Sequence, residues 1–522
     1  MNGTATPERI SDFVSLHALQ QPERQAAVLD GRTVSYAQLD AAMQAYGRAM
    51  IASGIQKGDR VATLAPPGIE YLVTFLAAIS VGAIWIGLNP VYQLRELLVV
   101  LRDANPSLLL ARTRIRDRSF DDELAAIAAE IGSIKTIVAL DEMVPGAVDC
   151  DSFLARGAQV SDAAYEAARR SPAPADPCLI VYTSGTTGTP KGAVLSHRGL
   201  AGTSVEQNRI WPVEDLRILN YFPINHVGCV ADVTCPTLTA AGCLVFLEKY
   251  DTAESLRLIE EQRVTCLLTV PSVYQMQLDH PDFARRDLSS VELIIWEGAA
   301  LPREIIRRLL DWCDRLATNY GLTESVGAVT VLPPSSDVDE LDGSVGFPNI
   351  GVEVRLVDLE GNLVEGEGEG ELQARSAYNM LGYWNNPEAT AATIVDGWLR
   401  TGDLAARTQD GRYKIVGRLK EMYKSGGYNV YPREVETVIE EIPGVALAAV
   451  VGVADPVWQE VGIAYVIADD NLDADTILKH CRTRLANYKI PKRVFVHKEL
   501  PLLPIGKVDK GALRNLYAEQ PA

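Results

Sequence analysis

Apolar positions in the first 170 residues alternate between helical spacing and short continuous runs. The segment VSYAQLDAAMQAYGRAMIAS, from Val34, places apolar residues three and four apart and ends at Gly54, a residue type that often follows a helix. DRVATLAP then predicts a strand, and GIEYLVTFLAAISVGA and IWIGLNP repeat the helix and the strand. This alternation predicts a mostly parallel sheet covered by helices on both faces.

The same alternation returns between Leu179 and Ser325. Strands are predicted near ILNYF, CLVFLE, VTCLLTV and VELIIW, and helices near AESLRLIEEQR and REIIRRLLDWC. We therefore expect two sheet-and-helix subdomains that pack together. In such folds, ligands bind at the loops that leave the carboxyl ends of the strands.

The pattern changes between about 340 and 415, where VEVRLVDLEGNLVEGEGEGELQAR predicts short alternating strands around an LEGN turn. After GRLKE, at 417–421, a compact α/β pattern of about 100 residues follows. The predicted fold class is α/β. A large N-terminal domain, 1–419, holds two sheet-and-helix subdomains and a small β subdomain, and a small α+β C-terminal domain covers 420–522.

Composition excludes several classes of protein. A chain of 522 residues is too long for one core. Its net charge of −19 argues against a general attraction to nucleic acid or anionic lipid. The eight cysteines include no C-x-x-C pair and predict buried free thiols in a reducing compartment. No stretch reaches about 18 uninterrupted apolar residues and no signal peptide is evident. We expect a cytoplasmic protein without an integral membrane segment.

The segment IVYTSGTTGTPKG, 180–192, predicts a strand that leads into a phosphate-binding loop. Glycines there allow backbone N–H groups to converge on one point, hydroxyls add donors and a lysine adds a cation. The residues are Thr183, Ser184, Gly185, Thr186, Thr187, Gly188, Thr189 and Lys191. The P-loop motif fails, because Pro190 and Gly192 replace two of its four fixed residues. The alternative is a Ser/Thr/Gly linker.

The string YTSGTTGTPKGAVLSH resembles the phosphate loop of the adenylate-forming superfamily, which includes acyl-CoA synthetases, adenylation domains and luciferases. Further strings resemble the family in the same order: NYGLTES, GYWNNPEAT, WLRTGDLA, YKIVGRLKEMYKSGGYNVYPREVE and PLLPIGKV. Together they span about two thirds of the chain. The resemblance implies a small C-terminal domain that is mobile.

The NYGLTES string, 319–325, combines a ring able to stack on a purine with a hydroxyl and a carboxylate able to reach a phosphate and Mg²⁺. A simple turn is the alternative. The resemblance assigns the metal to Glu324, and further nucleotide contacts to Asn319, Tyr320, Gly321, Thr323, Gly298, Ala299, Ala300 and Ile415. The family commonly has Ser or Gly before the run at 298–300, where this chain has Trp296 and Glu297.

Asp403 and Arg418 resemble the family's ribose contacts, with surface ion pairs as the alternative. Lys507 resembles the lysine that bridges the substrate carboxylate and the α-phosphate, where a cation offsets the repulsion between two anions. Lys420 matches the hinge about which the C-terminal domain rotates. The loop that would then line the pantetheine tunnel is formed by Lys424, Ser425, Gly426 and Gly427, with a plain Gly-Gly turn as the alternative.

The acyl pocket is also inferred from the resemblance. His226 matches a residue at the pocket entrance, although a lone histidine in an apolar run is more often structural. Gly228 suggests room and Trp296 a flat apolar wall. The residues expected to face the acyl group are His226, Gly228, Asp232, Ser272, Tyr274, Trp296 and Glu297. The residues expected to act in catalysis are Lys507, Thr187, Glu324 and His226.

The leading interpretation is an enzyme that makes acyl-CoA from a hydrophobic monocarboxylic acid, ATP and CoA through an acyl-adenylate, with Mg²⁺ on the departing pyrophosphate. One alternative is an adenylating enzyme that loads a carrier protein, and another is a luciferase-like oxygenase. A nucleotide-binding homologue without catalysis is disfavoured, because Thr187, Glu324, Asp403, Arg418 and Lys507 are all present. The chain is expected to be a monomer or a homodimer that binds no nucleic acid.

Overall fold

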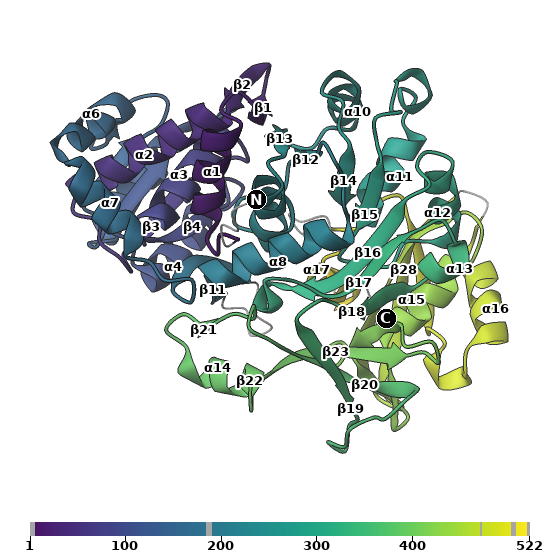
Figure 1. Cartoon of the computed structure of the whole chain (residues 1–522). Helices are drawn as coiled ribbons and strands as arrows, with labels where there is room; N and C mark the ends of the chain where they lie inside the picture. Colours follow the sequence, from purple (N-terminus) through teal and green to yellow (C-terminus); the bar gives the residue numbers. More distant parts are fainter. Residues whose placement is uncertain (1–5, 184–189, 470–471, 503–507, 519–522) are drawn as a thin grey trace.

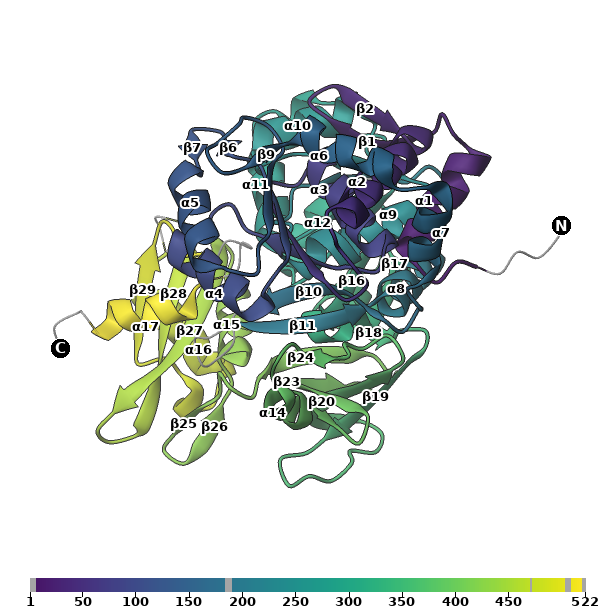
Figure 2. The same ribbon diagram turned by 90° about the vertical axis from the view of Figure 1, so that its left-hand side faces the viewer.

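The computed structural model describes residues 6–183, 190–469, 472–502 and 508–518. Figure 1 shows the subdomain that begins the chain beside the subdomain that holds β12–β17, with the strands β19–β23 below them. The turned view in Figure 2 shows the C-terminal strands and helices as a separate lobe at the edge of this body. A large N-terminal part and a small C-terminal part, as expected, make up this mixed α/β fold.

The first sheet has eight strands, and six neighbouring strands in it are parallel. Their order begins with two antiparallel edge strands, β21 and β11, before the parallel set. In sheet order the strands are β21 (Gly382–Tyr383), β11 (Lys191–Ser196), β10 (Pro177–Thr183), β4 (Ile84–Leu88), β3 (Arg60–Leu64), β5 (Leu108–Ala111), β8 (Thr136–Ala139) and β9 (Val148–Asp149).

The helices of this subdomain follow the predicted pattern. They include α2 (Tyr36–Ala52), α3 (Ile69–Ser80), α4 (Leu94–Ala104) and α5 (Asp121–Glu130). Helix α2 begins with a capping box at Ser35, and Gly54 beyond its end has a φ of 85°, as expected of the residue that stops a helix. Every residue of α3 except Glu70 is buried, which explains why the rest of its sequence is almost entirely apolar.

The second sheet has fourteen strands. Its parallel part contains β1 (Gln25–Leu29), β13 (Cys243–Phe246), β12 (Arg217–Asn220), β14 (Cys266–Thr269), β15 (Leu293–Trp296) and β16 (Leu316–Leu322). Two antiparallel strands follow, β17 (Gly327–Ser335) and β18 (Ser344–Pro348), and β2 (Arg32–Ser35) closes the other edge. The helices that cover it are α8 (His197–Ile210), α10 (Thr252–Glu261), α11 (Pro271–Asp279) and α12 (Arg303–Leu310).

The small β subdomain is continuous with this sheet rather than separate from it. Strand β18 pairs with β17 near Pro348 and with β24 near Ser344, so one ladder of hydrogen bonds crosses from the large subdomain to the small one. The strands that follow are β24 (Tyr413–Arg418), β23 (Trp398–Arg407), β20 (Gly368–Ser376) and β19 (Val352–Val357), with β22 (Ile394–Val395) beside β23.

One helical segment departs from the α pattern. Residues Gly228–Thr234 form η2, a π-helix that runs into α9 (Cys235–Thr239), and every residue of η2 is buried. A π-helix is rare and occurs mostly at functional sites. Apolar periodicity cannot reveal it, because a buried segment has no solvent face from which to read a period.

The C-terminal part has its own sheet of five strands. They are β25 (Tyr423–Ser425), β26 (Tyr428–Val430), β27 (Val445–Asp455), β28 (Gln459–Ala468) and β29 (Arg493–His497). One face of this sheet packs on α15 (Pro432–Glu440) and α16 (Ala474–Arg484), and the other packs on α17 (Lys510–Ala518). Lys420 lies in the turn between β24 and β25, and the domain boundary assigned there stays a prediction.

The cysteines agree with the prediction of free, mostly buried thiols. All eight cysteines are free, and seven are buried while Cys150 is partly exposed. Among the residues that the structure describes, no helix combines the length and the apolar character that crossing a membrane requires.

The two sheets meet closely at Gly87 in β4. A Cβ atom there would lie 2.4 Å from the backbone oxygen of Ile224, in the segment that carries His226. Gly87→Ala should therefore displace this backbone, destabilise the protein by about 1–3 kcal/mol and lower the midpoint of thermal unfolding. Gly132→Ala is the control, because a Cβ at Gly132 meets no atom within 4 Å. Equal midpoints for the two variants would contradict this account.

Candidate active site

The predicted phosphate loop connects two antiparallel strands. Thr183 ends β10 and pairs with Lys191, the first residue of β11, so the two strands form a hairpin. Its tip contains Ser184, Gly185, Thr186, Thr187 and Gly188, which lie outside the described residues. The Nζ atom of Lys191 lies 5.2 Å from the centre of the Tyr383 ring, within reach of a cation–π interaction.

Tyr383 connects this hairpin to Glu324. Strand β21 pairs with β11, opposing Tyr383 to Ala193. The Tyr383 hydroxyl donates a 2.7 Å hydrogen bond to Oε1 of Glu324, and the backbone N–H of Met380 donates to the Glu324 carbonyl. Burial, together with this carboxylate, raises the pKa of Tyr383, so the phenol remains a donor. Lys191 and Glu324, 133 residues apart in sequence (324 − 191), thus both contact Tyr383.

Tyr320, Asp403 and Arg418 form a second cluster. The Tyr320 hydroxyl donates to Oδ2 of Asp403 at 2.6 Å, and Nε of Arg418 lies 3.2 Å from Oδ1. The side chain of Asp403 is 4% exposed while that of Arg418 is 55% exposed. Burial and the neighbouring Asp403 raise the pKa of Tyr320 well above its usual value. These two donors hold the buried carboxylate of Asp403 in place, next to the half-exposed Arg418.

The other expected nucleotide residues surround the ends of β15 and β16. Gly298 follows β15, has a φ of 81° and leads into an exposed loop with Ala299 and Ala300. Asn319, Tyr320 and Gly321 lie in β16, and Thr323 begins the short helix η4 (Thr323–Ser325). Parallel strands β15 and β16 bring these carboxyl-terminal segments to one edge of the sheet. Ile415 is partly buried in β24, against the core of the β subdomain.

The expected CoA loop is the β25–β26 hairpin. Lys424 is exposed and Ser425 is buried, and the turn contains Gly426 and Gly427, whose φ values are 59° and 87°. These φ values are strained for other residues, which explains the two glycines. A Cβ at Gly427 would meet nothing within 4 Å, so the turn is open to solvent there. Lys507 lies outside the described residues.

The acyl residues divide into two groups. In the first, Nδ1 of His226 accepts a hydrogen bond from the backbone N–H of Gly228 at 3.0 Å. A Cβ at Gly228 would lie 3.0 Å from that Nδ1 and 3.3 Å from Oε1 of Glu297. The room expected at Gly228 is therefore not open in this structure, because the side chains of His226 and Glu297 fill it.

In the second group, Tyr274 and Trp296 lie in the hydrophobic core. Their exposed fractions are 0% and 2%, and the Tyr274 hydroxyl donates to the backbone oxygens of Ile295 and Leu267. Ser272, at the start of α11, is partly exposed. Trp296 therefore packs against core side chains in place of the open apolar wall expected, and contact of these residues with an acyl group stays a prediction.

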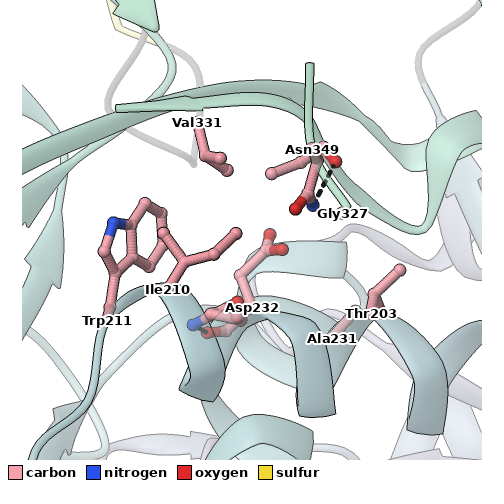
Figure 3. Close-up of a pocket in the computed structure, with 10 residues that line it drawn as sticks. Thr203, Ile210, Trp211, Ala231, Asp232, Gly327, Val331 and Asn349 are labelled. Atoms are coloured by element: carbon pink, nitrogen blue, oxygen red, sulfur yellow. Dashed lines mark hydrogen bonds between the residues drawn. The ribbon is translucent and has the colours of Figure 1, made fainter. Parts of the chain in front are cut away.

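A pocket lies between α8, η2 and β17, and Figure 3 shows Asp232 at its centre. Of the expected acyl residues, Asp232 alone lines it. The other lining residues are Thr203, Gln207, Ile210, Trp211, Ala231, Gly327, Ala328, Val331 and Asn349. Sequence motifs did not indicate the α8 residues, although Gly327 and Ala328 follow the NYGLTES string after one intervening residue and could have been included on that ground.

These features define an α/β enzyme in which polar groups gather where parallel strands end, the place at which such folds bind nucleotides. Comparison with known families agrees with a nucleotide-binding enzyme. Residues 14–384 match the family of AMP-binding enzymes, and residues 434–507 match the C-terminal domain of AMP-binding enzymes. The chain belongs to this family of AMP-binding enzymes.

Individual relatives are similar over almost their whole length. The chain is 35% identical to a feruloyl-CoA synthase from an Amycolatopsis species, over 96% of this chain and 97% of the relative. It is 34% identical to an indoleacetate–CoA ligase from Aromatoleum aromaticum, with 98% of each covered. The crystal structure of ATP-bound MatB from Rhodopseudomonas palustris superposes with a TM-score of 0.86 at 31% identity, covering 98% of this chain and 99% of that one.

The cluster around Asp403 yields a testable expectation. Asp403→Asn would present an amide to two donors in a buried position, so one of them loses its acceptor. We expect the apparent KM for ATP to rise by about tenfold or more. Tyr320→Phe, which keeps the ring and removes one donor, should have the smaller effect. Steady-state kinetics with varied ATP measure both, and an unchanged KM for Asp403→Asn would remove this cluster from the nucleotide site.

Proposed function

We propose that the chain is an AMP-forming acid–CoA ligase, which joins a hydrophobic monocarboxylic acid to CoA through an acyl-adenylate. The observation that carries the proposal is the arrangement around Tyr383 and Tyr320. It brings the end of the phosphate hairpin, Glu324 and the Asp403–Arg418 pair to neighbouring strand ends. Relatives named as CoA ligases or synthases, similar along their whole length, support the same reaction.

ATP fits this arrangement. The hairpin supplies Lys191 and the loop residues for the phosphates, and Asp403 supplies a fixed acceptor for the ribose hydroxyls. Arg418, half exposed, lies beside this carboxyl group and offsets its negative charge. The exposed run at 298–300 and the ring of Tyr320 flank the adenine in this proposal.

The first step is attack of the substrate carboxylate on the α-phosphate, with pyrophosphate as the leaving group. Two anions must approach each other, and Lys507 supplies the cation between them. In the second step the CoA thiol attacks the carbonyl of the mixed anhydride and AMP leaves. Between the two steps, the C-terminal domain would rotate about a hinge at Lys420, with the domain boundary at 419/420. CoA would then enter beside Gly427.

A magnesium ion suits the carboxylate of Glu324. Its Oε1 accepts from Tyr383, and within the described residues its second oxygen has no partner. Mg²⁺ commonly binds one or two carboxylates together with substrate phosphates, so a single glutamate suffices. That fits the finding that the described residues contain no group of three or more His, Cys, Asp or Glu side chains able to hold a metal. The ion would neutralise the pyrophosphate.

Loading of a carrier protein is the second candidate, because it shares the adenylation step and differs only in the thiol. CoA is favoured by the relatives, which are named for CoA products. An oxygenase of the luciferase type would share the same first step. The free thiols support a reducing compartment, the cytoplasm, and we propose a monomer or a homodimer.

The proposal is tested by a panel of aromatic, alicyclic and aliphatic acids, assayed for AMP release with and without CoA. We expect release that depends on the acid and on CoA. Hydrophobic acids should be preferred to acetate, because each pair of buried methylenes contributes roughly 1 kcal/mol or more. AMP release that is the same with and without CoA for every acid would exclude the acid–CoA ligase function.

The two half-reactions should respond differently to two variants. Lys507→Ala should cost about 3 kcal/mol or more in adenylation, judged from the loss of one preorganised donor, while preformed acyl-adenylate and CoA should still react. Gly427→Trp should show the opposite pattern. Pyrophosphate exchange measures the first step, and thioester release from synthetic adenylate measures the second. Equal losses in both steps for Lys507→Ala would argue against alternation of the C-terminal domain.

Removal of the Glu324 charge should weaken the use of magnesium. Glu324→Gln should lower kcat/KM by roughly 10²-fold, and excess Mg²⁺ should restore part of the loss. Tyr383→Phe removes the hydroxyl bound to Glu324 but keeps the carboxylate, so its dependence on Mg²⁺ should change less. Activity as a function of Mg²⁺ concentration is the measurement. A normal Mg²⁺ dependence for Glu324→Gln would leave Glu324 with a structural role only.

A further inference from the structure

The pocket between α8, η2 and β17 begins where the nucleotide motif ends. Glu324 lies in η4, and the next strand begins at Gly327, which lines the pocket together with Ala328. An acid whose carboxyl group lies beside Glu324 would extend past Gly327 toward this pocket, whose side chains must move apart to admit it because its open volume is only about 10 Å³. Much of its wall is apolar, from Ile210, Trp211, Ala231, Ala328 and Val331.

Three polar side chains of the pocket donate hydrogen bonds to the protein's own backbone. The Thr203 hydroxyl donates to the carbonyl of Gly199 at 2.8 Å. Nε2 of Gln207 donates to the backbone oxygen of Asp232 at 3.0 Å. Nδ2 of Asn349 donates to the carbonyl of Ala328 at 2.8 Å, as the dashed line in Figure 3 marks. The single donor of Thr203 is thus used, and each of the two amides keeps one further N–H.

Asp232 differs from them. It is 8% exposed, and its carboxyl group points into the pocket in Figure 3. Within the described parts of the chain, no hydrogen bond or ion pair reaches this carboxyl group. Gly327 of β17 lies beside it, where an added Cβ would be 3.6 Å from Oδ1. A buried polar group without a partner costs free energy, so a partner that arrives with a ligand would recover that cost.

The protonation state of Asp232 limits the chemistry of that partner. Burial, and secondarily the charge of Glu297, raise the pKa of Asp232 well above its usual value. The shift favours the protonated form, which donates through its O–H and accepts through its second oxygen. A neutral carboxyl among apolar walls suits a neutral oxygen group of the ligand, which can be a hydroxyl or a ketone.

A second hollow lies behind the first and shares Gln207, Trp211 and Asp232 with it. It is otherwise mainly apolar, with Leu216, Ile218, Val233, Leu293 and Ile295 among its lining residues. Asp232 therefore lies between two hydrophobic spaces rather than at the end of one. An oxygen within the hydrophobic body of a ligand, at some distance from its carboxyl group, would match this position.

We propose that Asp232 is a specificity-determining residue of the acyl pocket, which selects carboxylic acids that carry a hydroxyl or keto oxygen on an otherwise hydrophobic body. This inference rests on the proposed ligase function. It assigns Asp232 to recognition of the substrate and gives it no part in the adenylation chemistry. The hydroxyl and the ketone are two sources of the same chemistry. A hydroxyl can both accept from and donate to Asp232, whereas a ketone can only accept from it.

The experiment compares four forms of one arylpropanoic acid in kcat/KM: unsubstituted, hydroxylated, acetylated on the ring and aminomethylated. The wild-type enzyme should favour an oxygen-bearing form over the unsubstituted form by about tenfold or more, because a pocket built to hydrogen-bond a group rejects the analogue that lacks it. Asp232→Leu should abolish or reverse this preference, while Asp232→Asn, which retains a donor and an acceptor, should keep most of it.

Thr234→Val is the control. Thr234 is a buried residue of the same helix whose hydroxyl accepts from Tyr71 and Asn220, away from the pocket. Its loss can lower stability but should leave the preference between acids unchanged. The comparison therefore separates a damaged helix from a lost ligand contact.

Each outcome bears on one proposal. No oxygen preference in the wild type, or the same preference in Asp232→Leu, overturns the role of Asp232, as does a preference for the aminomethyl form. The wild-type comparison decides even if Asp232→Leu fails to fold. Failure of the ligase proposal looks different, because then no acid of any form would give AMP release that depends on CoA.

Discussion

The pairing of β11 with the two-residue strand β21 holds the site together. It opposes Ala193 to Tyr383, and the ring of Tyr383 lies beneath Lys191 while its hydroxyl contacts Glu324. The phosphate hairpin and the carboxylate belong to different sheets, so no single sheet could fix their separation. The short strand β21 does so, and the separation of Lys191 from Glu324 depends on its ladder with β11.

The alternation of helices and strands could be predicted, because half-buried helices and buried parallel strands have different periods. Helix α2 and strands β3 and β4 lie where their sequences indicate. The continuity of the second sheet through β18 could not, because strand pairing between distant segments leaves no mark in local periodicity. The same limit applies to the π-helix at Gly228–Thr234.

The candidate site shows the same division. Motifs selected candidate residues by their chemical type, such as Glu324 and Asp403, and the structure brings these beside Tyr383 and Tyr320. Motifs could not tell an apolar side chain in a pocket from one in the core. Trp296 illustrates this, since it belongs to a cluster of buried core residues and is 2% exposed. Asp232 is informative for the opposite reason, because a buried carboxyl stands out wherever it lies.

Strand β18 also connects the pocket wall to the strand that leads into the C-terminal part. On one side it pairs with β17, whose residues form a wall of the pocket. On the other it pairs with β24, which ends at Arg418, two residues before Lys420. Hydrogen-bonded sheets are stiff, because interiors are close-packed and resist small deformations. One rigid sheet therefore contains both the strand that leads to the C-terminal part and the pocket wall on which an acyl group would rest. Rotation of the C-terminal part would then leave the pocket wall unchanged.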